Sequence, residues 1–278
     1  MDLWHAILLG FIEGVTEFLP ISSTGHLTIV EKLLGYRIND PSVTAFTAII
    51  QSGAVLATLV YFWKDIIRVA TAWFKGLVTI RARKNVDYSY GWAIILGSIP
   101  IAIIGFVFKD EIETVLRSLW FVAGALILWS GIMWYADRKA TQKRGESDTT
   151  WRDTLIIGLA QCLALIPGVS RSGATMSAGL LRGFDRVTVT RLSFFLSIPA
   201  LFAASILQIA TKHSDIEHGV GWMATGVATF VSFVVAYISI AWLLKFIAKH
   251  DYSIFIWYRL GLGALLVVLL ATGTISAV

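Results

Sequence analysis

The sequence predicts an all-α polytopic membrane protein, built as an inverted-topology repeat with six spanning helices and two re-entrant, broken-helix segments. The first observation behind this prediction is composition, because 56% of the 278 residues are hydrophobic and only 15% are charged. An average soluble domain has about 25% charged residues, and the mean hydropathy here is +0.74. Too few charged side chains remain to cover a soluble exterior. The composition therefore excludes an ordinary cytosolic enzyme, a disordered tail and a nucleic-acid-binding domain.

The second observation is a set of six apolar stretches, each long enough to cross a bilayer core, which takes about 20 residues of helix. They cover residues 44–63, 92–108, 120–135, 192–210, 222–247 and 254–271. Several begin or end at a tryptophan, which is typical of the membrane interface. We therefore expect one integral membrane domain over residues 1–278, in contact with membrane lipids and not with nucleic acid.

The third observation is that residues 3–30 and 155–181 are also apolar but are broken in the middle by Pro, Gly, Ser and charged residues. We expect both to be re-entrant or broken helices. Irregular backbone at membrane depth is tolerated only where it is buried in protein or lines a wet cavity. The breaks should therefore be functional.

Loop charge gives the expected orientation, because cytoplasmic loops carry the excess of Lys and Arg. The connections at residues 64–84 and 138–152 are basic, whereas those at 109–117 and 212–219 carry more acidic residues. The first broken segment must then enter from outside and the second from inside, each followed by three spans. This arrangement predicts two inverted repeats, about residues 1–136 and 153–278, with both termini outside.

A short internal match supports the repeat at an offset of 148 residues. Residues 10–13 read GFIE and residues 158–161 read GLAQ, while residues 22–25 read SSTG and residues 170–173 read SRSG. The matches fall at the same point of both halves. Two hairpins that enter from opposite faces would bring these tips together near the middle of the membrane.

The first tip contains two carboxylates, Glu13 and Glu17, four residues apart on one helical face. Two carboxylates this close cannot both be ionised cheaply in an apolar setting. They need a shared proton, a cation or an arginine, unless they form a solvated helix end. A divalent cation, Mg²⁺ or Ca²⁺, that bridges them to phosphate oxygens would meet this need.

After Pro20, the run Ser22, Ser23, Thr24 and Gly25 offers hydroxyls and backbone amides at the start of a helix. Such a turn can cradle an anion, and it can equally be a simple N-cap, which is compatible with anion binding.

His26 follows three residues after Ser23. It is close enough to take the serine proton or to activate a water. The alternative is a structural histidine.

The second tip places Arg171 within a long apolar segment, where an unpaired guanidinium is costly. Its anionic partner is either the glutamate pair, as a structural ion pair, or a phosphate that it binds bidentately. Ser170, Ser172, Gly173 and Thr175 surround it with hydroxyls and backbone amides. Together the tips indicate chemistry on a phosphorylated lipid. A lipid-phosphate flippase or transporter would use the same midplane anion site and stays the main alternative.

Residues 13–26, EGVTEFLPISSTGH, and residues 167–175, PGVSRSGAT, closely resemble the two signature motifs of the bacterial undecaprenyl-diphosphatase family, also called the bacitracin-resistance family. The resemblance covers essentially the whole chain. It implies hydrolysis of undecaprenyl diphosphate to undecaprenyl phosphate and inorganic phosphate, which recycles the lipid carrier of peptidoglycan synthesis and confers bacitracin resistance. It also implies a bacterial plasma membrane location, a site open to the periplasmic or extracellular face, and a divalent cation. A homodimer is left open.

The resemblance also implies roles for individual residues. It assigns the catalytic positions Glu17, Ser23, His26 and Arg171, the metal ligands Glu13 and Glu17, and the substrate-binding positions Glu13, Ser22, Thr24, Gly25, Ser170, Ser172, Gly173 and Thr175. In one mechanism Ser23 attacks the terminal phosphorus with His26 as base. In the other, His26 activates a water directly.

Overall fold

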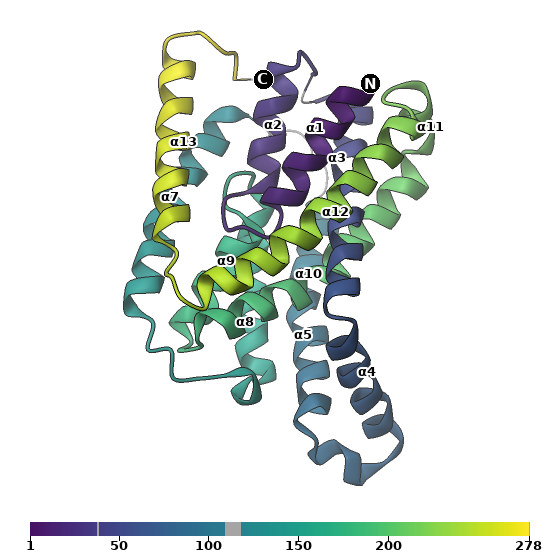
Figure 1. The fold of residues 1–278 in the computed structure, drawn as a ribbon, viewed down its shortest axis with the longest axis vertical. Coiled ribbons are helices and arrows are strands. Elements are labelled where there is room, and N and C mark those ends of the chain that lie inside the picture. Colours follow the sequence, from purple (N-terminus) through teal and green to yellow (C-terminus); the bar gives the residue numbers. More distant parts are fainter. Residues whose placement is uncertain (38, 109–117, 278) are drawn as a thin grey trace.

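The computed structural model describes residues 1–37, 39–108 and 118–277, and every regular element in these residues is a helix (Figure 1). Six helices of the described residues are long and apolar enough to cross a membrane, which confirms the all-α class and the six spans. They are α3 (Pro41–Tyr61), α5 (Val86–Val107), α7 (Leu119–Lys139), α10 (Arg186–Thr211), α12 (Trp222–Ile247) and α13 (Ser253–Ala271). The acidic connection at residues 109–117 lies outside the described residues.

Both broken segments consist of two short helices separated by a turn. The first contains α1 (Leu3–Thr16) and α2 (Ser23–Leu33), and the second contains α8 (Trp151–Cys162) and α9 (Arg171–Leu181). These helices have 11 to 14 residues, fewer than the roughly 20 that a bilayer core requires. Each break falls where the sequence predicts it, while the re-entrant path through the membrane stays a prediction.

The helix pairings fit the predicted repeat. Helix α1 packs on α12 and α8 packs on α5, while α3 pairs with α10 and α7 pairs with α13. If the two repeats share one order, α1 corresponds to α8, α3 to α10, α5 to α12 and α7 to α13. The α1–α12 pair is then equivalent to the α8–α5 pair, and the α3–α10 and α7–α13 pairs are each equivalent to themselves. Both chain ends also lie at the same end of the molecule (Figure 1). The repeat boundaries themselves stay a prediction.

Two glycines, 148 residues apart in the sequence, allow close helix crossings. A Cβ at Gly10 would overlap the backbone of Ala228 on α12, and a Cβ at Gly158 would overlap the carbonyl oxygen of Gly97 on α5. Small residues permit such close approach between membrane helices. The crossings hold α1 and α8, and thus the first arm of each hairpin, against the spanning helices.

The basic connection at residues 64–84, expected as a loop, instead forms α4 (Trp63–Val78) and the 3-10 helix η1 (Ile80–Lys84). Val69, Ala72 and Gly76 recur on one face of α4 and are buried, with Gly76 against the ring of Tyr88 on α5. Apolar residues at helical spacing thus outweigh the charges that indicated a loop. Helix α4 and the start of α5 project together from the rest of the molecule (Figure 1).

Ion pairs fix the start of the second hairpin. Asp153, buried in the first turn of α8, pairs with Arg144 at 2.6 Å and with Arg182 at 2.8 Å. Burial favours the neutral acid, but the hydrogen bonds from Arg144 and Thr150 outweigh it and hold the pKa of Asp153 well below its usual range. This cluster anchors both ends of the α8 and α9 hairpin to the preceding loop.

Arg259, on α13, is fully buried and joins the two hairpin tips. Its guanidinium donates to the carbonyl oxygens of Pro20 at 3.2 Å and Gly168 at 2.8 Å, which are again 148 residues apart. It also donates to Ser130 Oγ at 3.2 Å and Ala125 O at 3.4 Å on α7. No carboxylate of the described residues pairs with it. Arg259 thus satisfies backbone carbonyls that the broken helices leave free.

We predict that Gly158→Ala lowers the free energy of unfolding by roughly 1–3 kcal/mol, because the added methyl group forces α8 away from α5. Gly226→Ala is the matched control, since a Cβ there meets nothing within 4 Å. Denaturant titration of both variants in the same detergent measures the difference. Equal stability of the two variants would contradict the close crossing.

We predict that Arg259→Met also destabilises the fold, because each hydrogen bond to a charged donor contributes about 1.5–3 kcal/mol. Arg259→Lys keeps the charge but cannot reach four acceptors, so its thermal midpoint should lie between those of the wild type and Arg259→Met. Arg81→Met, on an exposed side chain of η1, controls for loss of charge alone. If the thermal midpoint of Arg259→Met is as high as that of Arg81→Met, Arg259 is not needed to stabilise the two hairpin tips.

Candidate active site

The two hairpin tips begin their second helices in the same way. Ser22 caps α2 with φ 75° and Ser170 caps α9 with φ 76°. A non-glycine residue with positive φ is uncommon, and such strained backbone is concentrated at functional sites. The shared conformation at positions 148 residues apart indicates that both tips are built to one plan.

Hydrogen bonds join the tips to each other. The backbone N–H of Gly168 donates to Ser22 Oγ at 3.1 Å, and Ser172 Oγ donates to the carbonyl of Leu19 at 2.9 Å. Residues far apart in the sequence therefore form one turn region, as the hairpin prediction requires.

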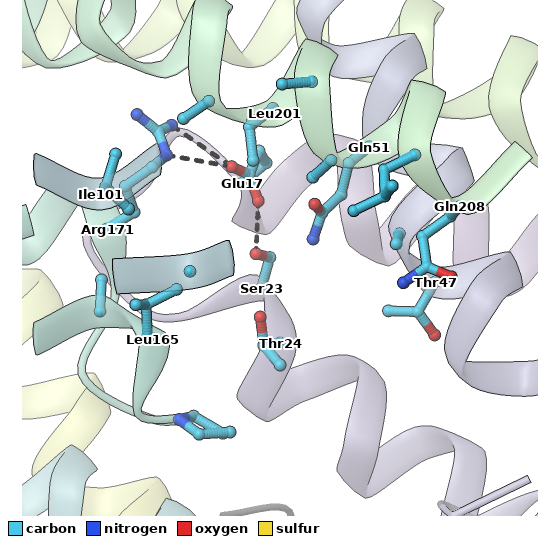
Figure 2. Close-up of a pocket in the computed structure, with 18 of the residues that line it drawn as sticks. Glu17, Ser23, Thr24, Thr47, Gln51, Ile101, Leu165, Arg171, Leu201 and Gln208 are labelled. Atoms are coloured by element: carbon cyan, nitrogen blue, oxygen red, sulfur yellow. Dashed lines mark hydrogen bonds and ion pairs between the residues drawn. The ribbon is translucent and has the colours of Figure 1, made fainter. Parts of the chain in front are cut away.

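Glu17 lies at the centre of this region (Figure 2). Ser23 Oγ donates to Glu17 Oε2 at 2.5 Å, while Nε and Nη2 of Arg171 donate to Glu17 Oε1 at 3.4 and 3.3 Å. Arg171 Nη1 also donates to the carbonyl of Ser193 at 2.9 Å. The sequence left two anionic partners open for Arg171, the glutamate pair and a phosphate. In this structure Arg171 contacts the Glu17 carboxylate.

These three side chains line a cavity of about 410 Å³. Most of the wall is apolar and comes from α5, from the turn after α8 and from α10. The lining residues are Glu17, Ser22, Ser23, Thr24, Thr44, Thr47, Ala48, Gln51, Ile101, Ala102, Gly105, Phe106, Ala164, Leu165, Pro167, Ser170, Arg171, Ala200, Leu201, Ala203, Ala204, Leu207 and Gln208. A serine, a carboxylate and a guanidinium at an apolar cavity can activate a hydroxyl nucleophile and orient an anion.

His26 lies outside this lining. Its Nδ1 contacts the carbonyl of Ser22 at 2.7 Å and must donate to it, and its Nε2 contacts the hydroxyl of Tyr258 at 2.7 Å. The ring also stacks on Tyr258 with centroids 5.5 Å apart. The expected contact between His26 and Ser23 is absent from the hydrogen bonds of the described residues, and Glu17 takes that position. A catalytic role for His26 stays a prediction.

The expected N-caps are formed at both tips. Gly25 N–H donates to Ser22 Oγ at 3.3 Å, and Gly173 N–H donates to Ser170 Oγ at 3.1 Å. Ser22, Thr24 and Ser170 also line the cavity. Capping and anion binding are therefore compatible here, as expected.

Ser172 and Thr175 lie behind the lining rather than in it. Both are fully buried. Thr175 Oγ1 contacts Ser193 Oγ at 2.7 Å, next to the carbonyl that accepts from Arg171. These two residues support the tip backbone and the arginine, while the direct substrate contact expected of them stays a prediction.

Glu13 is fully buried beside Glu17, and neither of its carboxylate oxygens accepts a hydrogen bond from a donor group of the described residues. It lies one helical turn before Glu17, and its oxygens match the ligand preference of a hard divalent cation. No group of three or more His, Cys, Asp or Glu side chains is placed to hold a metal ion in the part of the chain that the structure describes. The pair of glutamates therefore fits a cation whose other ligands are phosphate oxygens and water.

Three residues of this region were not anticipated from the sequence. Glu31 is fully buried and accepts from Thr47 at 2.7 Å, but it follows the predicted end of the first broken segment by one residue. Arg259 is the only charged residue within residues 254–271, and Gln51 is a long polar side chain within residues 44–63. For Arg259 and Gln51, a polar side chain inside an apolar stretch was the available signal.

Comparisons with known proteins give one result over the whole chain. The model of the family described as bacitracin resistance protein BacA matches residues 6–265. The chain is 67% identical over 277 residues to a protein named undecaprenyl-diphosphatase 3 from Frankia casuarinae, and 54% identical over 284 residues to an undecaprenyl-diphosphatase from Cutibacterium acnes, with 100% of both chains covered in each case. Identity to the undecaprenyl-diphosphatase from Mycobacterium ulcerans is 44% over 281 residues, again with full coverage. The chain therefore belongs to the bacitracin resistance protein BacA family.

Proposed function

We propose that this membrane protein hydrolyses undecaprenyl diphosphate to undecaprenyl phosphate and inorganic phosphate, and so recycles the lipid carrier for cell-wall synthesis and confers bacitracin resistance. The observation that carries the proposal is the contact of Ser23 and Arg171 with Glu17 at an apolar cavity. Relatives that share the full length are named for this activity. None of those names supports the flippase alternative.

The cavity suits a lipid diphosphate because polar and apolar groups share one space. Ile101, Phe106 and Leu165 provide apolar wall beside Ser23 and Arg171. A prenyl chain on this wall would leave its diphosphate at the N-terminus of α2, where backbone N–H groups and the helix dipole favour an anion. A water-soluble phosphate ester would gain nothing from the apolar wall.

The geometry supports Ser23 as nucleophile and Glu17 as its base. Ser23 Oγ attacks the terminal phosphorus while its proton passes to Glu17 Oε2, and the bond from that phosphorus to the bridging oxygen breaks to release undecaprenyl phosphate. Water then attacks the phosphoserine, the proton held by Glu17 returns to the departing Ser23 Oγ, and the orthophosphate leaves with both hydrogens of the water. Arg171 orients Glu17 and lies beside the charge that develops on the phosphoryl oxygens. Direct attack by water, with His26 as its base, is the second route.

Glu13 and Glu17 would hold the divalent cation, Mg²⁺ or Ca²⁺. When bound, it would offset the negative charge of the diphosphate. The unpartnered oxygens of Glu13 support this assignment.

We also propose that the cavity opens to the periplasmic or extracellular face of the plasma membrane. Thr44 and Gln208 line it, and they lie near the ends of α3 and α10 that loop charge assigns to the outside. A homodimer stays a prediction, and we assign no residues to its interface.

In detergent, where no compartments exist, the purified protein should release orthophosphate from undecaprenyl diphosphate, and Ser23→Ala should lower kcat by about 10³-fold or more. Ser177→Ala is the matched control, since Ser177 is buried on α9 but lies outside the cavity lining. Retention of near-normal turnover by Ser23→Ala would assign the attack to water. Movement of the lipid across a membrane without phosphate release would contradict the proposed hydrolysis.

Chelation should abolish phosphate release, and added Mg²⁺ or Ca²⁺ should restore it. Glu13→Gln should raise the cation concentration needed for half-maximal activity by at least about tenfold, because it removes a charged oxygen ligand. It should also remove the rise in thermal midpoint that the cation gives the wild type. Glu217→Gln, on the exposed surface of α11 (His213–His218), is the control. Full activity in excess chelator would contradict the cation.

A further inference from the structure

Gln51 is a polar side chain in the middle of a membrane-spanning helix. It lies near the centre of α3, which spans Pro41–Tyr61, and its carboxamide points into the cavity (Figure 2). It forms no hydrogen bond with any of the described residues. An unpartnered polar group at this depth is costly unless it serves a ligand or water in the cavity.

Gln51 and the apolar wall lie on opposite sides of the reacting groups. Glu17 and Ser23 lie between Gln51 on one side and Ile101 and Leu165 on the other (Figure 2). If the prenyl chain occupies the apolar side, the terminal phosphoryl group faces the side of Gln51. We refer to this side, lined by Thr44, Thr47, Gln51 and Gln208 from α3 and α10, as the polar arm of the cavity.

The polar arm contains neutral side chains only. The carboxylate of Glu31, beside Thr47, is fully buried and accepts a hydrogen bond from Thr47 Oγ1 at 2.7 Å. The carboxamide N–H groups of Gln51 can donate hydrogen bonds to phosphate without the strong attraction of a cation. Such donors would bind a phosphate and still allow it to leave.

We infer that the carboxamide of Gln51 donates a hydrogen bond to the terminal phosphoryl group of the lipid diphosphate, and that the polar arm binds the orthophosphate released at Ser23. This inference rests on the proposed function. It adds a substrate contact from α3, outside both hairpin tips. The arm leads from Ser23 toward the ends of α3 and α10 at which Thr44 and Gln208 lie.

The test compares the wild type with Gln51→Leu and Gln51→Glu in detergent. Gln51→Leu removes the donor, so the inhibition constant of orthophosphate should rise about tenfold, which corresponds to about 1.4 kcal/mol, and kcat/KM for the lipid diphosphate should fall. Gln51→Glu keeps the size of the side chain but adds an acidic group, so it should weaken orthophosphate inhibition further. Ser52→Ala, whose hydroxyl bonds to the carbonyl of Ile49 at 2.6 Å outside the cavity lining, should match the wild type.

Failure of this inference can be distinguished from failure of the proposed function. If the wild type releases phosphate and both Gln51 variants keep its orthophosphate inhibition constant, Gln51 does not bind the phosphoryl group. If the wild type releases none, the proposed hydrolysis fails, and ³¹P NMR titration with inorganic phosphate still tests the arm. Weaker phosphate binding by a folded Gln51→Glu protein supports the contact, and unchanged binding overturns it. Thermal midpoints identify any variant that has lost its fold.

Discussion

The ion pair between Glu17 and Arg171 is the interaction on which the rest of the site depends. Their charged atoms lie 3.3 Å apart, with 9% or less of either side chain exposed. Removing two charges from water costs several kcal/mol for each, and only close pairing with further hydrogen bonds offsets it. Ser23 and the Ser193 carbonyl supply those bonds. Because the two charges come from different halves of the chain, neither half can bury its own charge without the other.

The broken backbone imposes a second requirement at the same place. Turns at membrane depth would leave carbonyl and N–H groups that water cannot reach. Arg259 donates to a carbonyl in each tip, and Ser22 and Ser172 connect the tips by side-chain bonds to backbone. The groups that satisfy the backbone thus also fix the turns that carry Ser23 and Glu17.

The sequence could predict the parts of this arrangement that follow from local composition. The length of the apolar stretches is enough to predict the six spanning helices. Charged residues inside apolar segments are enough to select Glu13, Glu17 and Arg171 as candidate site residues. Partner choice could not be predicted, because it depends on which helices cross. His26 is three residues from Ser23, but the carbonyl of Ser22 and the hydroxyl of Tyr258 on α13 engage its ring. The helix α4 was missed because its basic residues resemble a cytoplasmic loop, while its buried face depends on contact with α5.

The two sides of the cavity have different electrostatic character, and this difference fits the order of events at a phosphatase site. Glu17 and Arg171 are fixed by bonds to protein, so they can stabilise charge on a reacting group without first reorganising. The side chains of the polar arm carry no charge to retain an anion. A site with cations on both sides would bind phosphate more tightly before and after reaction alike, which lowers KM without raising kcat. Restricting charge to one side favours the transition state over the product.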